Sequence, residues 1–181
     1  MNRVFVTALY LILPVTLAAV GHMVVVRLRL LSWLAHPVHL RWFGANKTWR
    51  GLVVMPVAGV LAMAAVRPLE QRWDELLLVH LAQKRWVLLG AALGAAYALF
   101  ELPNSYLKRR LGIAPGAQAE QHRWLFFLLD HLDSLLGVAA TYAVFLGGFP
   151  LPLLLAVLMG PAVHVAVNLA LRACHLRATW F

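Results

Sequence analysis

Long apolar runs separated by short polar and basic segments make up most of the sequence. A helix that crosses a membrane needs about 20 largely apolar residues, and five runs approach or reach this length. They cover residues 4–26, 51–66, 86–102, 124–146 and 149–171. The pattern therefore predicts an all-α, polytopic integral membrane protein in which about five transmembrane helices form a single domain over residues 1–181.

The first two runs each depart from the simplest pattern of a membrane-spanning helix. Arg3 precedes the first run, as a basic residue precedes the apolar core of a signal peptide. Such a core is usually about 7–15 residues long, and this run is longer, so we expect an uncleaved helix. The second run is the shortest and contains Pro56 and Gly59, but it is still predicted to span the bilayer.

The composition supports this class of protein. Hydrophobic residues make up 62% of the chain and charged residues only 13%, whereas soluble domains carry about 25% charged residues. A single cysteine, Cys174, excludes a disulfide framework and a four-cysteine metal site. The net charge of +9 indicates loops that face anionic headgroups, or a site for phosphates, rather than a partner nucleic acid.

Most of the 16 Lys and Arg residues lie on one side of the predicted spans. That side holds Arg27, Arg29, Arg41, Lys47, Arg50, Lys108, Arg109, Arg110, Arg123, Arg172 and Arg177. The other side holds Arg3, Arg67, Arg72, Lys84 and Arg85. Basic loops stay in the cytoplasm, so we expect a multi-pass protein of the cytoplasmic membrane with its N-terminus outside and its first and third loops inside.

The fourth span contains two acids, Asp130 and Asp133, one helical turn apart. A charged side chain in mid-membrane costs about 2.5–3.5 kcal/mol, and two close carboxylates repel each other unless a cation lies between them. Oxygen ligands favour magnesium or calcium over zinc. The pair therefore predicts a divalent metal site. Glu101, at the end of the third span, could be a further ligand of this metal, or it could instead lie at the membrane interface in contact with headgroup water. The alternative is ion pairing with Arg123 or Lys108.

Two loops on the basic side carry residues suited to phosphates. The first loop ends in Asn46, Lys47, Thr48 and Arg50 just before a predicted helix, and backbone N–H groups at such a position bind anions. The third loop contains Ser105 followed by Lys108, Arg109 and Arg110. These three cations could simply anchor the topology. Together with carboxylates on the same side, they favour magnesium-dependent chemistry on a nucleotide.

The fifth span carries His164 and Asn168 on one helical face, directed toward the basic end. A lone histidine inside a membrane is often a packing residue. Because Asn168 and Arg172 share its face at helical spacing, lining of a site is an equal alternative.

These residues together resemble the CDP-archaeol synthase family, relatives of the CDP-diglyceride synthetases. The resemblance rests on residues 46–51, 105–112, 130–133, 164–168 and 176–180, and extends from about Arg41 to the end. It implies a five-helix membrane enzyme that transfers CMP from CTP to an isoprenoid glycerol phosphate with release of pyrophosphate. It also implies that the acidic residues bind Mg²⁺.

The resemblance implies a role for each candidate residue. Catalytic roles fall to Lys108, Arg109, Asp130 and Asp133, and Mg²⁺ ligation to Glu101, Asp130 and Asp133. Substrate contacts fall to Asn46, Lys47, Thr48, Arg50, Ser105, Arg110, His164 and Asn168.

The chain departs from the family at two places. It has Phe100-Glu101 where the family has Gly-Asp, and Ala45-Asn46 where the family has Asp-Gly. A bacterial phosphatidate is therefore an alternative lipid phosphate acceptor. A non-enzymatic protein, such as a cation-coupled transporter or a scaffold subunit, and an inactive relative of the family are the alternative functions.

Overall fold

The computed structural model describes residues 2–81, 85–115, 117 and 123–174. Within these residues the chain is helical and forms no strand. Five helices are long and apolar enough to cross a membrane. They are α1 (Arg3–Arg27), α3 (Trp49–Arg72), α4 (Trp86–Arg110), α5 (Arg123–Leu146) and α6 (Leu151–Ala173). The prediction of an all-α protein with five spans is confirmed.

Two of these helices continue beyond their expected ends. Helix α3 runs past residue 66 through Pro68 to Arg72, and α4 runs past residue 102 through Pro103 to Arg110. A proline removes one helical hydrogen bond, but it does not always end a helix. The expected loop at Ser105 and the three cations is therefore wrong: these residues form the last turns of α4, where basic side chains also interact favourably with the helix dipole.

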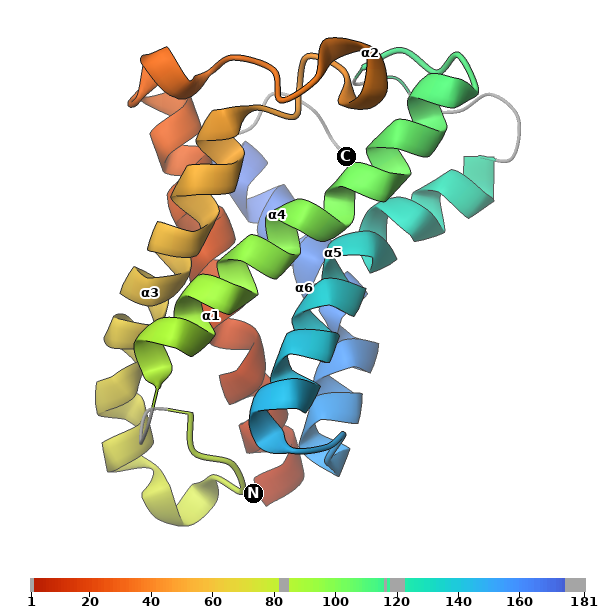
Figure 1. Ribbon diagram of the computed structural model, residues 1–181. Coiled ribbons are helices and arrows are strands. Elements are labelled where there is room, and N and C mark those ends of the chain that lie inside the picture. Colours follow the sequence, from red (N-terminus) through yellow and green to blue (C-terminus); the bar gives the residue numbers. More distant parts are fainter. Residues whose placement is uncertain (1, 82–84, 116, 118–122, 175–181) are drawn as a thin grey trace.

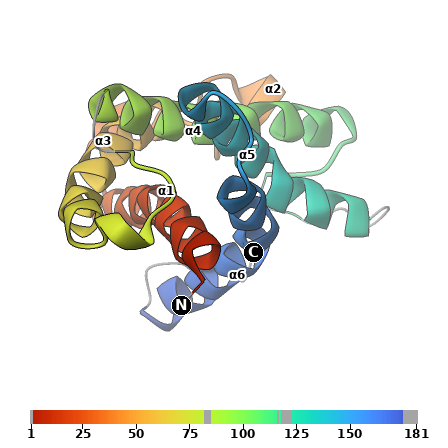
Figure 2. The ribbon, with the colours of Figure 1, turned by 90° about the horizontal axis from the view of Figure 1, so that it is seen from below.

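Short elements join the spans. The first connection contains η1 (Ser32–Leu34) and α2 (Leu40–Phe43), and the second contains η2 (Asp74–Leu76). Figure 1 shows the first connection at the same end of the bundle as the end of α4 and the start of α5, with the N-terminus at the opposite end. In Figure 2, α3 and α6 lie on opposite sides of α1. The segments predicted to share the basic side therefore do lie together.

Helices α3 and α4 approach each other closely at glycines. A Cβ atom on Gly59 would lie 2.0 Å from the carbonyl oxygen of Gly90, and one on Gly94 would lie 2.0 Å from that of Met55. Both neighbours are backbone atoms, so only glycine fits at these positions. The Gly-x-x-x-Gly spacing in α4 thus serves close helix packing, and it directs the Glu101 end of α4 toward the start of α3.

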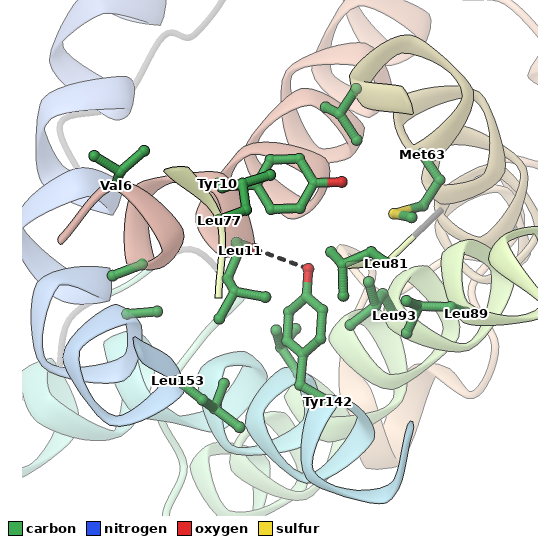
Figure 3. Packing of buried hydrophobic residues seen from close by; sticks show 14 residues of the cluster. Val6, Tyr10, Leu11, Met63, Leu77, Leu81, Leu89, Leu93, Tyr142 and Leu153 are labelled. Atoms are coloured by element: carbon green, nitrogen blue, oxygen red, sulfur yellow. Dashed lines mark hydrogen bonds between the residues drawn. The ribbon is translucent and has the colours of Figure 1, made fainter. Parts of the chain in front are cut away.

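The core lies among α1, α3, α4, α5 and α6 (Figure 3). Its largest fully buried side chains include Tyr10, Tyr142, Leu11, Met63 and Leu153. The Tyr142 hydroxyl donates a hydrogen bond to the Leu11 carbonyl oxygen at 2.8 Å, which satisfies both buried polar groups and fixes α5 against α1.

At the end away from the first connection, a buried carboxylate fastens the second connection to the bundle. Glu70 is 5% exposed, and its Oε2 accepts hydrogen bonds from the Tyr10 hydroxyl at 2.5 Å and from the Leu81 N–H at 2.8 Å. The Leu78 N–H donates to Thr7 Oγ1 at 2.9 Å. Helix α1 thus holds both α3 and the segment that follows it.

Tyr10→Phe should destabilise the protein without changing its shape. The variant removes one hydrogen bond to a buried charge, a contribution of about 1.5–3 kcal/mol, and leaves Glu70 its other partners, which include the Leu81 N–H. Thermal unfolding in detergent micelles measures this loss. Tyr106→Phe, which removes a hydroxyl on the exposed Arg110 contact, is the matched control and should shift the midpoint less. Equal unfolding midpoints for both variants would contradict a stabilising role for the hydrogen bond between Tyr10 and Glu70.

Candidate active site

A cavity of about 1500 Å³ opens where the first connection meets α4 and α5. Its polar lining comes from α1, the first connection, the start of α3, α4, α5 and α6. Apolar side chains line its continuation between α1, α5 and α6, and they include Leu11, Val15, Leu135, Val138, Tyr142 and Leu153. The cavity therefore joins a charged compartment to an apolar one.

All the residues predicted for the site line this cavity, with the exception of Arg110. The lining includes Asn46, Lys47, Thr48, Arg50, Glu101, Ser105, Lys108, Arg109, Asp130, Asp133, His164 and Asn168. Arg110 instead donates from Nε to the Tyr106 hydroxyl at 2.8 Å, and its guanidinium lies 5.1 Å from the centre of that ring. His164 and Asn168 both line the cavity from α6.

Asp130 and Asp133 on α5 are joined by an amide from α4. Asn104 Nδ2 donates to Asp130 Oδ1 at 2.7 Å and to Asp133 Oδ2 at 2.8 Å. Sequence reasoning missed Asn104, because the residue was expected in a loop. Its position in the sequence did indicate a shared face, since Asn104 follows Glu101 by three residues and precedes Lys108 by four. Residues so spaced lie on one face of a helix.

Asp130 also forms an ion pair. Lys108 Nζ lies 2.5 Å and 2.6 Å from its two carboxylate oxygens, so the predicted alternative partner is present. Asp133 accepts from the Ser134 N–H at 2.6 Å in addition to Asn104. The other predicted partner, the side chain of Arg123, lies outside the described residues.

Glu101 at the cavity is ion-paired across two segments of the chain. Its Oε2 forms an ion pair with Lys47 Nζ, which links the first connection to α4. Within the described part of the chain, no group of three or more His, Cys, Asp and Glu side chains could hold a metal. The structure thus brings together the two aspartates but does not add Glu101 to form a three-acid cluster.

The donor set beside the aspartates nevertheless fits magnesium. The carboxylates of Asp130 and Asp133 and the amide of Asn104 present oxygen atoms, which are the ligands this ion prefers. Asn104 Oδ1 is buried and has no hydrogen-bond partner among the described residues. Magnesium usually takes its remaining ligands from water and substrate phosphates, so two acids are enough for such a site.

Two arginines that line the same cavity offer buried donors. Arg109 Nε and Nη1 and Arg50 Nε make no hydrogen bond within the described residues. Gly44, at φ +82°, lets the first connection approach α4, because a Cβ there would lie 3.2 Å from Arg109 Nη1. Buried donors on a guanidinium are costly unless an anion accepts from them, so the arrangement suits a phosphate.

The end of the first connection has the expected local structure. Thr48 is the N-cap of α3, and its Oγ1 accepts weakly from the Gly51 N–H at 3.5 Å. Arg50 Nη1 donates to the Leu30 carbonyl oxygen at 3.3 Å, which fixes this side chain near the cavity.

His22 on α1 is a second cavity residue that sequence reasoning did not assign. A Cβ on Gly51 would lie 3.7 Å from its Nε2, so the imidazole lies against the start of α3. The sequence offered one signal, a polar residue interrupting an apolar span, but no pattern showed which helix it would meet.

The fold and the cavity define a multi-pass membrane protein in which acids and cations from distant segments line one polar compartment. Residues 1–181 match the CarS-like family, described as CDP-archaeol synthase, and the chain belongs to this family. The resemblance inferred from its motifs is thus confirmed.

A curated relative is the CDP-archaeol synthase of Staphylothermus marinus (strain ATCC 43588 / DSM 3639 / JCM 9404 / F1). It is 28% identical over 131 residues, which are 70% of this chain and 64% of that protein. The chain therefore spans less than two thirds of the length of this relative. No solved structure matches the chain.

Proposed function

We propose that the protein is a cytidylyltransferase that transfers CMP from CTP to the phosphate of a membrane lipid and releases pyrophosphate. The observation that carries this proposal is the cavity, in which paired carboxylates and buried arginine donors adjoin an apolar compartment. Membership of the CarS-like family and the name of the relative from Staphylothermus marinus support it.

In this reaction an oxygen of the lipid phosphate attacks the α-phosphorus of CTP. A new P–O bond to the lipid forms as the bond to pyrophosphate breaks. The attacking oxygen is already anionic, so the protein needs no general base, and catalysis depends on positioning and charge neutralisation. Asp130 and Asp133 would hold magnesium, which supplies positive charge to the phosphates when bound.

The cations of the cavity would bind the triphosphate. Lys47, Lys108 and Arg109 line the same cavity. The side chains of Asn46, Thr48 and Ser105 would add hydrogen bonds. Lys108 and Lys47 would exchange their carboxylate partners for phosphate oxygens. Arg50 is the better candidate for the lipid phosphate, because Arg110 lies against Tyr106 and outside the cavity lining.

The apolar continuation of the cavity would take the lipid chains. Its lining by α1, α5 and α6 side chains keeps the acceptor out of water while its phosphate reaches the charged end. An isoprenoid glycerol phosphate is the acceptor that the family suggests, and a diacyl phosphatidate is the alternative.

Pyrophosphate release tests the function directly. Purified protein in detergent micelles should release pyrophosphate from CTP only when magnesium and a lipid phosphate are both present. Parallel reactions with an isoprenoid and a diacyl glycerol phosphate identify the acceptor. No release with either lipid, or release that needs no lipid, would contradict the proposal, and ion flux in vesicles without release would indicate a transporter.

Lys108→Ala and Arg109→Ala should each raise the KM for CTP and lower kcat/KM by at least about tenfold, or about 1.4 kcal/mol. Arg109→Lys should be impaired less, because lysine keeps the charge but lacks the planar fork. Arg110→Ala is the matched control, since this arginine contacts Tyr106. Steady-state kinetics at saturating magnesium measure the KM and kcat/KM for CTP in each variant. Wild-type constants in both alanine variants would place the nucleotide elsewhere.

We also propose that the protein lies in the cytoplasmic membrane and that its cavity opens to the cytoplasm, where CTP is available. The basic side of the sequence carries the first connection and the end of α4. In a Cys174→Ser background, cysteine placed at Ala117 should be shielded from an impermeant reagent added outside, and cysteine at Gln71 should react. Both positions are exposed. The reverse labelling would overturn the orientation.

A further inference from the structure

We infer that Asn104 is a ligand of the divalent cation bound at Asp130 and Asp133, through its amide oxygen. The inference rests on the proposed function, and it assigns to this residue a role that the sequence did not suggest. In the structure the same amide donates from its nitrogen to both acids and joins the two carboxylates.

The first argument is burial. Asn104 is only 9% exposed, and its Oδ1 accepts no hydrogen bond from the described residues. A buried acceptor without a partner is destabilising, and this oxygen of the amide has none among the described residues. A cation between the carboxylates would give that oxygen a partner.

The second argument is spacing. Asn104 Nδ2 lies 2.7 Å from Asp130 Oδ1 and 2.8 Å from Asp133 Oδ2. Oxygen ligands about 2.0–2.1 Å from an octahedral magnesium ion are about 2.9 Å from one another. The amide nitrogen therefore already occupies a place that suits a neighbouring ligand.

The third argument is the shape of the amide group. Its nitrogen and oxygen are nearly equal in size, so a half turn about the last side-chain bond exchanges them with little movement of other atoms. Oxygen facing two carboxylates is repulsive without a cation, and N–H facing a cation is repulsive with one. Cation binding thus favours the turned amide, and cation loss favours the orientation seen here.

A purely structural role makes the opposite prediction. If Asn104 only bridges the acids, its removal leaves both carboxylates more available, and cation affinity stays the same or rises. If Asn104 is a ligand, its removal lowers the affinity. Cation binding without nucleotide or lipid therefore separates the two roles.

Manganese, which also takes octahedral oxygen ligands, is a suitable probe because its free form is measured by electron paramagnetic resonance. With the full chain in micelles, Asn104→Leu should weaken Mn²⁺ binding at least about tenfold, the lower end of what supporting groups contribute at metal sites. Asn104→Asp should retain or increase the affinity, since it keeps an oxygen at this position. Asn168→Leu, the matched control, removes an equally buried amide of the same cavity and should bind Mn²⁺ normally.

Normal Mn²⁺ affinity in Asn104→Leu, or an equal loss in Asn168→Leu, would overturn the inference. Asp130→Asn separates this failure from that of the proposed function. If Asp130→Asn loses Mn²⁺ and Asn104→Leu does not, only the role of Asn104 is wrong. If Asp130→Asn also binds normally, no cation site exists at the aspartates, and the metal part of the proposed function is wrong as well.

Discussion

Asp130→Asn and Asp133→Asn are each expected to lower magnesium-dependent turnover by at least about a hundredfold, while the protein stays folded. Asparagine keeps the volume of the side chain and removes its charge. Even groups that only support metal ligands contribute about 10–100-fold, so a direct ligand should contribute at least as much. The measurement is pyrophosphate release over a range of magnesium concentrations.

The two variants differ in what they leave behind. Asp133→Asn keeps the ion pair between Lys108 and Asp130, whereas Asp130→Asn removes it. Asp74→Asn is the control for the loss of one acidic charge, since Asp74 belongs to η2 at the opposite end of the bundle. Normal turnover in both α5 variants would show that the acids are structural.

Gly94→Ala should destabilise the protein by about 3 kcal/mol, the upper range for overpacking in a core. The added Cβ would lie 2.0 Å from the Met55 carbonyl oxygen and 2.4 Å from its carbon. Backbone atoms cannot turn away as a side chain can, so α3 and α4 must separate. Thermal unfolding in micelles and the yield of monodisperse protein measure the effect.

Gly21→Ala is the matched control for this variant. Gly21 also lies in a spanning helix, but a Cβ there would meet nothing within 4 Å. Alanine is favoured over glycine inside a helix by about 0.5–1 kcal/mol, so this variant should be as stable as the wild type or slightly more so. A similar loss in both variants would rule out backbone contact as the cause.

The architecture could be predicted from the sequence because a bilayer imposes a strong length requirement on apolar helices. Apolar runs identified all five spans, but they could not place the ends of α3 and α4. Polar residues such as Ser105 and Lys108 end the hydrophobic pattern, yet their backbone continues as helix beyond the apolar part. Pro103 added to this error, since proline is usually a sign of a helix boundary.

Most of the charged side chains that line the cavity could also be predicted, because charged residues in or near spans are few. Their partners could not. Lys47 and Glu101 are 54 residues apart in the sequence, and they meet because the Gly59, Gly90 and Gly94 contact fixes how α4 crosses α3. The contact of Asn104 with the two aspartates could not be predicted either, because it depends on α5 lying next to α4.

The ion pairs of Lys47 with Glu101 and of Lys108 with Asp130 have a consequence for how the cavity would release a charged product. Both lysines already have built-in counter-ions, so an incoming polyanion must compete with carboxylates for them. Part of its binding free energy is offset by the pairs that it breaks. When the anion departs, the carboxylates recapture the lysines. The carboxylates of Glu101 and Asp130 thus compete with any bound phosphate compound for the two lysines, and this competition limits how tightly such a compound could be retained.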